Sequence, residues 1–186
     1  MCGNHCQCEG DSEFQVGKMA PDFELEAYYK GEFKRYGLSQ FRGKWVVLFF
    51  YPQDFTFICP TEIKEFSSKH SEFEQLNAVV LGASTDSVHS HKAWAERDFA
   101  DGLAYPILSD PTHRLSEDYG VYVTEDGVAL RGTFIIDPEG VLQWQCVHAL
   151  SVGRNVSEVK RVLEALQTGE LCGVNWESGK QTLGKA

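Results

Sequence analysis

The sequence has no hydrophobic run long enough to cross a membrane. Its longest apolar stretch covers residues 45–51, whereas a membrane-spanning helix needs about 20 apolar residues. The first residues, MCGNHCQCEG, have neither a basic start nor an apolar stretch, so we predict no secretory signal and a cytoplasmic location. Basic residues are scarce, because 17 Lys and Arg face 27 Asp and Glu and the net charge is -10. We therefore expect no binding to nucleic acid or to anionic membranes.

The chain has the size and composition of one folded domain. With 186 residues, of which 42% are hydrophobic and 24% charged, it falls outside the collagen-like, coiled-coil and wholly disordered classes. It contains no internal repeat and no linker rich in Pro or Ser. We predict a polar, cysteine-rich tail over residues 1–15, a folded domain over 16–169 and a C-terminal segment over 170–186.

Strand and helix patterns alternate along the central part of the chain. Residues 45–51 and 78–83 are apolar on both faces, which is typical of central strands covered by helices, and residues 60–76 carry one apolar stripe. Residues 128–136 and 141–148 flank the turn Asp-Pro-Glu-Gly and should pair as an antiparallel hairpin. We predict an α/β fold, a thioredoxin-like sandwich with a central mixed sheet flanked by helices.

Three further helices are predicted from residues at their ends. Asp86 is a candidate N-cap for one of them, and a short helix is expected near residues 113–120. Asn155, followed three positions later by Glu158, resembles a capping box, and Gly169 suits the end of that last helix.

Cys59 lies where a buried strand gives way to a helix. A seven-residue loop, PQDFTFI, separates it from the strand at residues 45–51, and Pro60, which suits the first helical position, follows it directly. The free N–H groups and the positive dipole end of a helix N-terminus favour the thiolate over the thiol. We therefore predict a reactive thiolate at Cys59 rather than an inert, buried thiol.

Two common chemistries of cysteine do not fit this segment. A local dithiol exchanger needs a second cysteine three positions after the first, where this chain has Glu62. A Cys-His hydrolase needs a positioned histidine base, and no histidine lies in a hydrolase signature. We expect the histidines beyond the tail to be surface residues or satisfied core residues. They are His70, His89, His91, His113 and His148.

The segment around Cys59 resembles the signature loop of the peroxiredoxins. Residues 52–62 read PQDFTFICPTE, which matches P-x-x-x-T-x-x-C-P-T-E. The motif RGTFIID at residues 131–137 resembles the strand that carries the active-site arginine of that family. Residues 151–176 resemble the C-terminal region of typical two-cysteine members, especially those of the bacterial alkyl hydroperoxide reductase type (AhpC). The resemblance extends from about residue 16 to the end.

The resemblance implies a thiol peroxidase that reduces hydrogen peroxide and small organic hydroperoxides to water and alcohols. Cys59 would be the peroxidatic cysteine, and Cys172 of a neighbouring subunit would resolve its sulfenic acid as an intersubunit disulfide. Thr56 would accept a hydrogen bond from the peroxide and donate one to the thiolate or to the developing charge. Arg131 would stabilise the thiolate and the charge that develops on the breaking O–O bond. Pro52 would shield Cys59 from water.

The resemblance also implies partners and an assembly. An external dithiol protein of thioredoxin-like or AhpF type would regenerate the enzyme, and the chain would form a homodimer, commonly assembled into a ring of five dimers. No cofactor and no metal are expected. Glu62 would either orient an arginine or only compensate the helix dipole. A peroxide-sensing or chaperone assembly remains an alternative.

Four residues of the tail, Cys2, Cys6, Cys8 and His5, have no counterpart in the family pattern. Three thiols and an imidazole could surround Zn²⁺ or Cu(I), which would make a metal-handling protein another alternative, but C-x-x-x-C-x-C is not a strong metal spacing. A tail without fixed structure, redox modification and a disulfide within the tail are the other interpretations. Cys146 is expected to be a packed, inert thiol.

Overall fold

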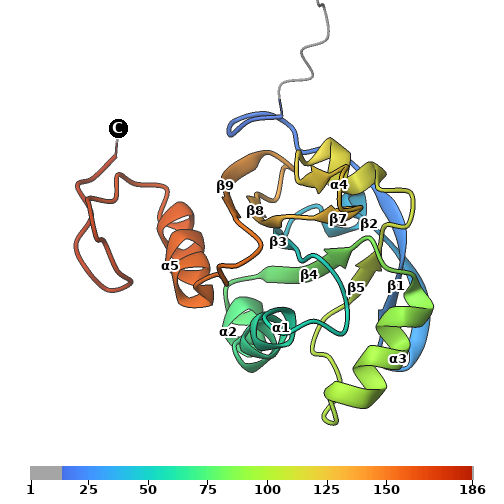
Figure 1. The fold of residues 1–186 in the computed structure, drawn as a ribbon. Coiled ribbons are helices and arrows are strands. Elements are labelled where there is room, and N and C mark those ends of the chain that lie inside the picture. Colours follow the sequence, from blue (N-terminus) through green and yellow to red (C-terminus); the bar gives the residue numbers. More distant parts are fainter. Residues whose placement is uncertain (1–13, 186) are drawn as a thin grey trace, which may run out of the picture.

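The computed structural model describes residues 14–185, whose main feature is one mixed sheet with helices on both sides (Figure 1). The elements in chain order are β1 (Glu24–Tyr29), β2 (Glu32–Gly37), η1 (Leu38–Phe41), β3 (Trp45–Phe50), α1 (Cys59–Ser68), α2 (His70–Gln75), β4 (Ala78–Ser84), α3 (Val88–Asp98), β5 (Ile107–Ser109), α4 (Arg114–Asp118), β6 (Tyr122–Val123), β7 (Val128–Ala129), β8 (Arg131–Ile136), β9 (Leu142–His148) and α5 (Val156–Gln167).

The main sheet has seven strands in the order β2-β1-β5-β4-β3-β8-β9. The central strand β3 runs parallel to β4 and antiparallel to β8, so the sheet is mixed, as the sequence predicts. The strands β6 and β7 form a separate two-stranded sheet. Within the described part of the chain, no helix is long and apolar enough to cross a bilayer.

Strand β3 is buried on both faces because a different layer covers each one. Val47, Phe49 and Tyr51 contribute to the core that lies under α1, α2, α3 and α5. The intervening residues of β3 point to the other core, under α4 and the chain that leads to β7. Every residue from Val46 to Tyr51 is at most 1% exposed, which explains the continuous apolar run in the sequence.

The β8–β9 hairpin forms as predicted. Asp137 and Gly140 close the turn with a backbone hydrogen bond of 2.9 Å, and Gly140 adopts a φ of 87°. The carboxylate of Asp137 also accepts hydrogen bonds from the N–H groups of Glu139 and Val141, at 3.0 and 2.8 Å. Asp therefore fixes the start of the turn, and Gly supplies the left-handed backbone at its end.

Several boundaries differ from the predicted ones. The helix expected over residues 60–76 is divided at Lys69 into α1 and α2. The strand expected over 128–136 is divided at Leu130, whose N–H donates to Val121, because the chain changes from the small sheet to the main sheet there. Ser87 rather than Asp86 caps α3, with its hydroxyl accepting from the N–H of Ser90.

The hairpin of β1 and β2 is an addition to the predicted elements. Its two-residue turn consists of Lys30 and Gly31, with φ values of 50° and 83°. Two consecutive positive φ values are typical of a type I′ turn, whose twist matches that of the two strands it connects. The sequence signal is weak, because Lys takes the place that Asn or Asp usually occupies in such turns.

Candidate active site

Cys59 is the first residue of α1, and its side chain is fully buried. Pro60 is therefore the second helical residue rather than the first. Ile58 precedes the helix and provides no side-chain cap, so the positive end of the helix dipole acts on the sulfur without a competing capping oxygen. The strand-to-helix junction predicted at Cys59 is present.

Arg131 brings a guanidinium to this sulfur from the first position of β8. Its Nη1 donates to Cys59 Sγ at 3.4 Å and to the Glu62 carboxylate at 2.8 Å. Its Nε donates to the carbonyl oxygen of Leu150 at 2.8 Å, which fixes the plane of the group. A cation in direct contact with the sulfur favours the thiolate over the thiol.

Glu62 holds two arginines at the same time. Its carboxylate accepts from Nη1 of Arg131 at 2.8 Å and from Nε of Arg154 at 2.9 Å, and the backbone N–H of Arg154 also donates to it, at 3.0 Å. All three side chains are at most 4% exposed. Of the two roles considered for Glu62, the structure favours the orientation of arginine, because both cations share its carboxylate.

Arg154 was missing from the sequence-based site. Its guanidinium donates to the carbonyl oxygens of Phe50 and Gly132 and to the hydroxyl of Thr133, at 2.5, 3.1 and 3.2 Å. It also lies 5.1 Å from the ring centroid of Phe49. Burial lowers the pKa of Arg154 below its ordinary value, and the charge of Glu62 opposes that shift. Arg154 thus connects α1, through Glu62, with β3 and β8.

Thr56 and Pro52 lie in the loop between β3 and α1. The Thr56 hydroxyl donates to the backbone carbonyl of Gln53 at 3.0 Å, and no hydrogen bond from it to Cys59 is present among the described residues. Its lone pairs therefore remain able to accept a hydrogen bond. Pro52 is buried where the loop leaves the sheet.

A buried polar network anchors the same loop to α3. The carboxylate of Asp54 accepts from the Tyr51 hydroxyl and the Ser90 hydroxyl, each at 2.8 Å, and lies 2.9 Å from Nδ1 of His91. Nε2 of His91 lies 3.1 Å from the carbonyl oxygen of Leu108. The Leu108 carbonyl can only accept, so Nε2 of His91 carries a proton, and Nδ1 faces the Asp54 carboxyl group. The network is therefore a buried, hydrogen-bonded Asp–His pair.

Asp86 extends this network. One of its carboxylate oxygens accepts from the backbone N–H of Asp54 at 2.8 Å and from the Ser84 hydroxyl at 2.9 Å. Burial raises the pKa of Asp86, and the nearby charge of Asp54 adds to this effect.

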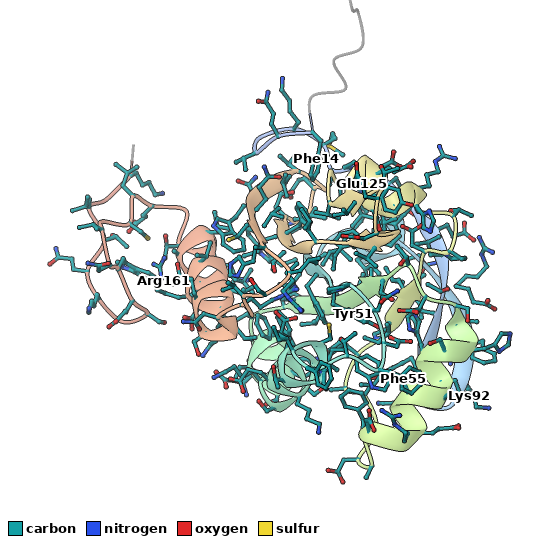
Figure 2. All side chains as sticks on the ribbon, viewed as in Figure 1. Phe14, Tyr51, Phe55, Lys92, Glu125 and Arg161 are labelled. Carbon is teal, nitrogen blue, oxygen red and sulfur yellow. The ribbon has the colours of Figure 1, made fainter. Side chains whose placement is uncertain are left out.

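Phe55, the next residue after Asp54, has a φ of 57° and packs beside α3 (Figure 2). Its ring centroid lies 6.1 Å from that of Trp94 and 4.5 Å from the guanidinium of Arg97.

Changing Asp54 to Asn should lower the free energy of unfolding by about 2 kcal/mol, because an NH₂ group replaces one of the buried oxygens around which Tyr51, Ser90 and His91 gather, and a buried donor is left without its acceptor. Denaturant unfolding monitored by circular dichroism measures this loss. Asp101→Asn is the matched control, since Asp101 is exposed and should change the free energy by less than about 0.5 kcal/mol. Equal unfolding midpoints for the two variants would contradict a stabilising role of the Asp54 network.

Cys172 lies beyond α5, apart from the cluster around Cys59. Its half-buried sulfur is 3.5 Å from the Thr168 hydroxyl and 3.8 Å from the carbonyl oxygen of Ala165. The surrounding segment is closed by two backbone hydrogen bonds of 2.8 Å, from Leu171 to Gly184 and from Leu183 to Leu171. In Figure 1, α5 stands between this segment and α1.

The other cysteines contribute nothing to this cluster in the described part of the chain. Cys146 lies on β9 opposite Thr133 and is half-buried. Cys2, Cys6, Cys8 and His5 fall outside the described residues. Among residues 14–185, no group of three or more His, Cys, Asp or Glu side chains could hold a metal ion.

Comparisons with known proteins agree with this geometry. Residues 16–145 match the AhpC/TSA family. The chloroplastic 2-Cys peroxiredoxin BAS1 of Spinacia oleracea is 51% identical over 177 residues, which are 90% of this chain and 67% of that protein. Peroxiredoxin-2 of Macaca fascicularis is 48% identical over 177 residues, 91% of this chain and 89% of that protein. The chain belongs to the AhpC/TSA family of peroxiredoxins.

Solved structures support the same assignment. The reduced 2-Cys peroxiredoxin of Plasmodium vivax superposes with a TM-score of 0.84 at 40% identity, over 89% of this chain and 91% of that chain. Mycobacterium tuberculosis AhpC gives a TM-score of 0.78 at 42% identity, over 88% and 98% of the two chains. The predicted family and the predicted thioredoxin-like fold are confirmed. As a peroxiredoxin, the protein is a thiol peroxidase that acts on peroxides.

Proposed function

We propose that Cys59 is the peroxidatic cysteine of this peroxiredoxin. The observation that carries the proposal is the 3.4 Å contact from Arg131 Nη1 to Cys59 Sγ at the start of α1. The thiolate attacks one peroxide oxygen, the O–O bond breaks, and the leaving oxygen takes a proton and departs as water or an alcohol. Cys59 becomes a sulfenic acid. Because its side chain is fully buried, the peroxide must displace a covering side chain to reach the sulfur.

In this proposal Arg131 stabilises the charges of the reaction and Thr56 hydrogen-bonds the bound peroxide. Arg131 is charged at every relevant pH and donates to the sulfur, so it stabilises both the thiolate and the negative charge that spreads onto the leaving oxygen. The Thr56 hydroxyl already donates to Gln53, so we assign it to accept the hydrogen bond of the peroxide O–H. Pro52 excludes water, and Glu62 positions Arg131.

Cys172 of a second subunit is the proposed resolving thiol. Its thiol attacks the sulfur of the Cys59 sulfenic acid, an intersubunit disulfide forms, and water leaves. The C-terminal segment, which carries Cys172, lies beyond α5 on the side away from α1 in Figure 1, and this supports a partner from another copy rather than from the same chain. The domain division at residues 15 and 169 fits this role, because the segment after 169 carries the second sulfur.

Changing Cys172 to Ser should remove the disulfide-linked dimer and lower steady-state turnover with a dithiol protein by at least about tenfold, since the sulfenic acid then has no resolving partner. The first turnover with peroxide should stay within about threefold, because Cys172 does not contact Cys59 in its own chain. Non-reducing electrophoresis and stopped-flow fluorescence measure the two effects. Cys146→Ser is the control and should keep both the dimer and turnover. A covalent dimer that persists in Cys172→Ser would refute the assignment.

The proposed substrates are hydrogen peroxide and small organic hydroperoxides, and the proposed reductant is a thioredoxin-like or AhpF-type dithiol protein. We further propose a homodimer assembled into a ring of five dimers in the cytoplasm. The acidic chain, with a net charge of -10, favours a reductant whose docking face is not itself strongly acidic. A steady-state assay with hydrogen peroxide, NADPH, thioredoxin reductase and thioredoxin tests the activity. Absence of catalytic consumption with either type of reductant would overturn the proposed function.

A further inference from the structure

A cavity of about 410 Å³ lies at the opposite end of the sheet from Cys59. Cys59 follows the carboxyl end of β3, whereas the cavity borders Lys44 and Ala78, which stand at the amino ends of β3 and β4. Its volume is in the range of small-molecule sites. Nothing in the proposed peroxidase chemistry uses it.

The cavity exists because β5 is short. Pro106 has no N–H, and β5 begins only at Ile107, so the first residues of β4 have no strand beside them on that side. The pairing of β4 with this neighbouring segment begins at Gly82, whose N–H donates to the Pro106 carbonyl at 3.1 Å. On the far side of the gap, the Tyr29 hydroxyl at the end of β1 donates to the carbonyl of Ala104 at 3.1 Å.

Aromatic rings supply much of the cavity wall. The rings of Tyr36 and Phe41 are nearly parallel, at 6°, with their centroids 6.4 Å apart. Tyr105 is 1% exposed, and its hydroxyl already donates a hydrogen bond to the carbonyl of Ile63 at 2.9 Å. Such walls offer planar apolar contact but few polar groups, which suits a flat aromatic molecule.

Two nitrogen atoms of the lining have unused hydrogen-bonding capacity. Nδ1 of His70 is buried without a partner among the described residues, while Nε2 of the same ring lies 3.4 Å from a carboxylate oxygen of Glu74. Lys44 is exposed and forms no ion pair in the described part of the chain. A buried polar atom without a partner is unfavourable, so a rotation of the His70 ring that brings Nδ1 to the cavity surface, where a ligand can accept from it, removes that penalty.

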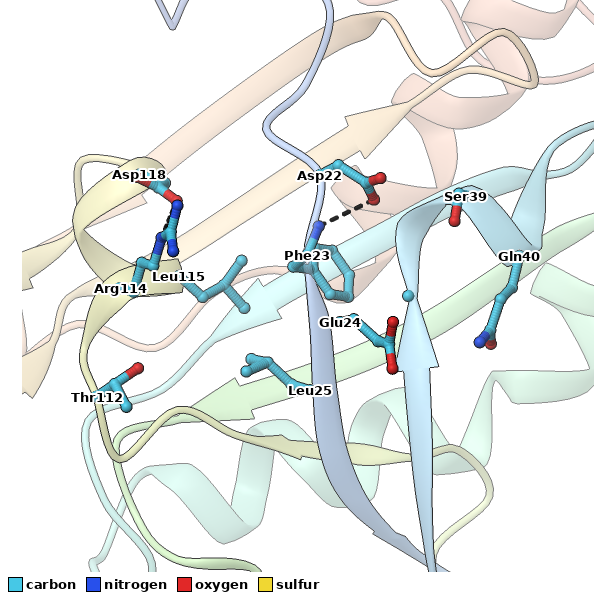
Figure 3. A pocket seen from close by; sticks show the side chains of 11 residues that line it. Asp22, Phe23, Glu24, Leu25, Ser39, Gln40, Thr112, Arg114, Leu115 and Asp118 are labelled. Carbon is cyan, nitrogen blue, oxygen red and sulfur yellow. Dashed lines mark hydrogen bonds and ion pairs between the residues drawn. The ribbon is translucent and has the colours of Figure 1, made fainter.

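A second cavity, of about 370 Å³, shows the contrast (Figure 3). Its carboxylates already have partners: Asp22 accepts from the N–H of Phe23 at 2.9 Å, Glu24 pairs with Arg35 at 2.8 Å, and Asp118 lies 3.9 Å from Arg114. It therefore lacks the unpaired buried atom that distinguishes the cavity beside His70.

We propose that the cavity beside His70 binds a planar aromatic molecule that carries one carboxylate. The ring system packs against Tyr36 and Phe41. The carboxylate pairs with Lys44 and, once the His70 ring turns Nδ1 toward the cavity, accepts a hydrogen bond from that nitrogen. The proposal is independent of Cys59.

Isothermal titration calorimetry of the full chain with 2-naphthoate tests this site, and naphthalene-2-carboxamide serves as the uncharged probe of the same shape. We expect saturable binding of one 2-naphthoate per chain. Lys44→Gln should weaken 2-naphthoate about fivefold, the upper range for one exposed ion pair, and should change carboxamide binding by less than about twofold. Tyr36→Ala should weaken both probes by removing a wall.

Lys18→Gln is the matched control, because Lys18 is also exposed and lies outside the cavity. It should leave both affinities unchanged, and Cys59→Ser should bind 2-naphthoate like the unmodified chain. Absence of saturable binding at millimolar 2-naphthoate, or the same affinity in Lys44→Gln and Lys18→Gln, would overturn the proposal. Loss of peroxidase activity in Cys59→Ser with naphthoate binding retained would separate the two functions.

Discussion

Replacing Cys59 by serine is expected to lower kcat/KM for hydrogen peroxide by at least about 1000-fold, to the level expected when an enzyme loses its nucleophile. A hydroxyl is not an anion at neutral pH and does not form the sulfenic acid intermediate, so the contact from Arg131 at 3.4 Å would have no thiolate to stabilise. Consumption of peroxide with a dithiol reductant, measured at several concentrations of peroxide, gives the size of the loss.

Serine is nearly the same size as cysteine, so the variant should keep its fold. Unfolding curves of Cys59→Ser and of the unmodified chain should agree within about 1 kcal/mol. Cys146→Ser, which alters a half-buried thiol on β9, should keep its activity within about threefold. A Cys59→Ser variant that is folded and retains a tenth of the activity would assign the chemistry to another group.

Local patterns in the sequence predict the junction at Cys59 well. The buried strand, the loop and the helix that begins with Cys-Pro are all encoded by neighbouring residues, and hydrophobic periodicity reveals such elements. Arg131 could be placed because it lies within the predicted strand 128–136 and inside a motif that resembles that of the family. The contact between Arg131 and Cys59 joins residues 72 positions apart, so the resemblance to a family, rather than periodicity, predicted it.

Residues whose partners are distant in the sequence could not be identified in this way. Asp86 looks like an N-cap, but its carboxylate accepts from the N–H of Asp54, 32 positions earlier, and Ser87 takes the capping role. Arg154 precedes a well-marked helix, and only Gly153 beside it hints at close packing. A Cβ at Gly153 would lie 3.3 Å from the Ile58 side chain. The roles of Asp86 and Arg154 are set by contacts with residues that are distant in the sequence. The residues next to them do not predict those contacts.

The buried charges around Glu62 have a consequence for stability as well as for chemistry. One carboxylate faces two guanidinium groups in a region that is almost fully buried. Removing either arginine leaves the other paired, whereas removing the carboxylate leaves two buried cations without a counter-charge. An arginine variant can therefore report on the reaction without unfolding the domain, and Arg131, which contacts the sulfur, is the informative one.

Changing Arg131 to Lys should lower the second-order rate constant for the reaction with peroxide by about 100- to 1000-fold, the range for losing a placed donor to a developing anion. The positive charge remains, but a single ammonium cannot donate to Cys59, Glu62 and the Leu150 carbonyl together, as the guanidinium does at 3.4, 2.8 and 2.8 Å. Stopped-flow fluorescence under single-turnover conditions measures the constant without interference from the reductant.

Arg35→Lys provides the control for this prediction, because Arg35 forms an exposed ion pair with Glu24 and its variant should react at the unmodified rate within about twofold. The rate of alkylation of Cys59 by iodoacetamide at pH 7 separates two contributions of Arg131. If alkylation of Arg131→Lys falls much less than the peroxide rate, the lysine still favours the thiolate, and the guanidinium acts mainly on the leaving oxygen. A peroxide rate within about fivefold of the unmodified protein would show that charge alone suffices and that the planar geometry of Arg131 is not required.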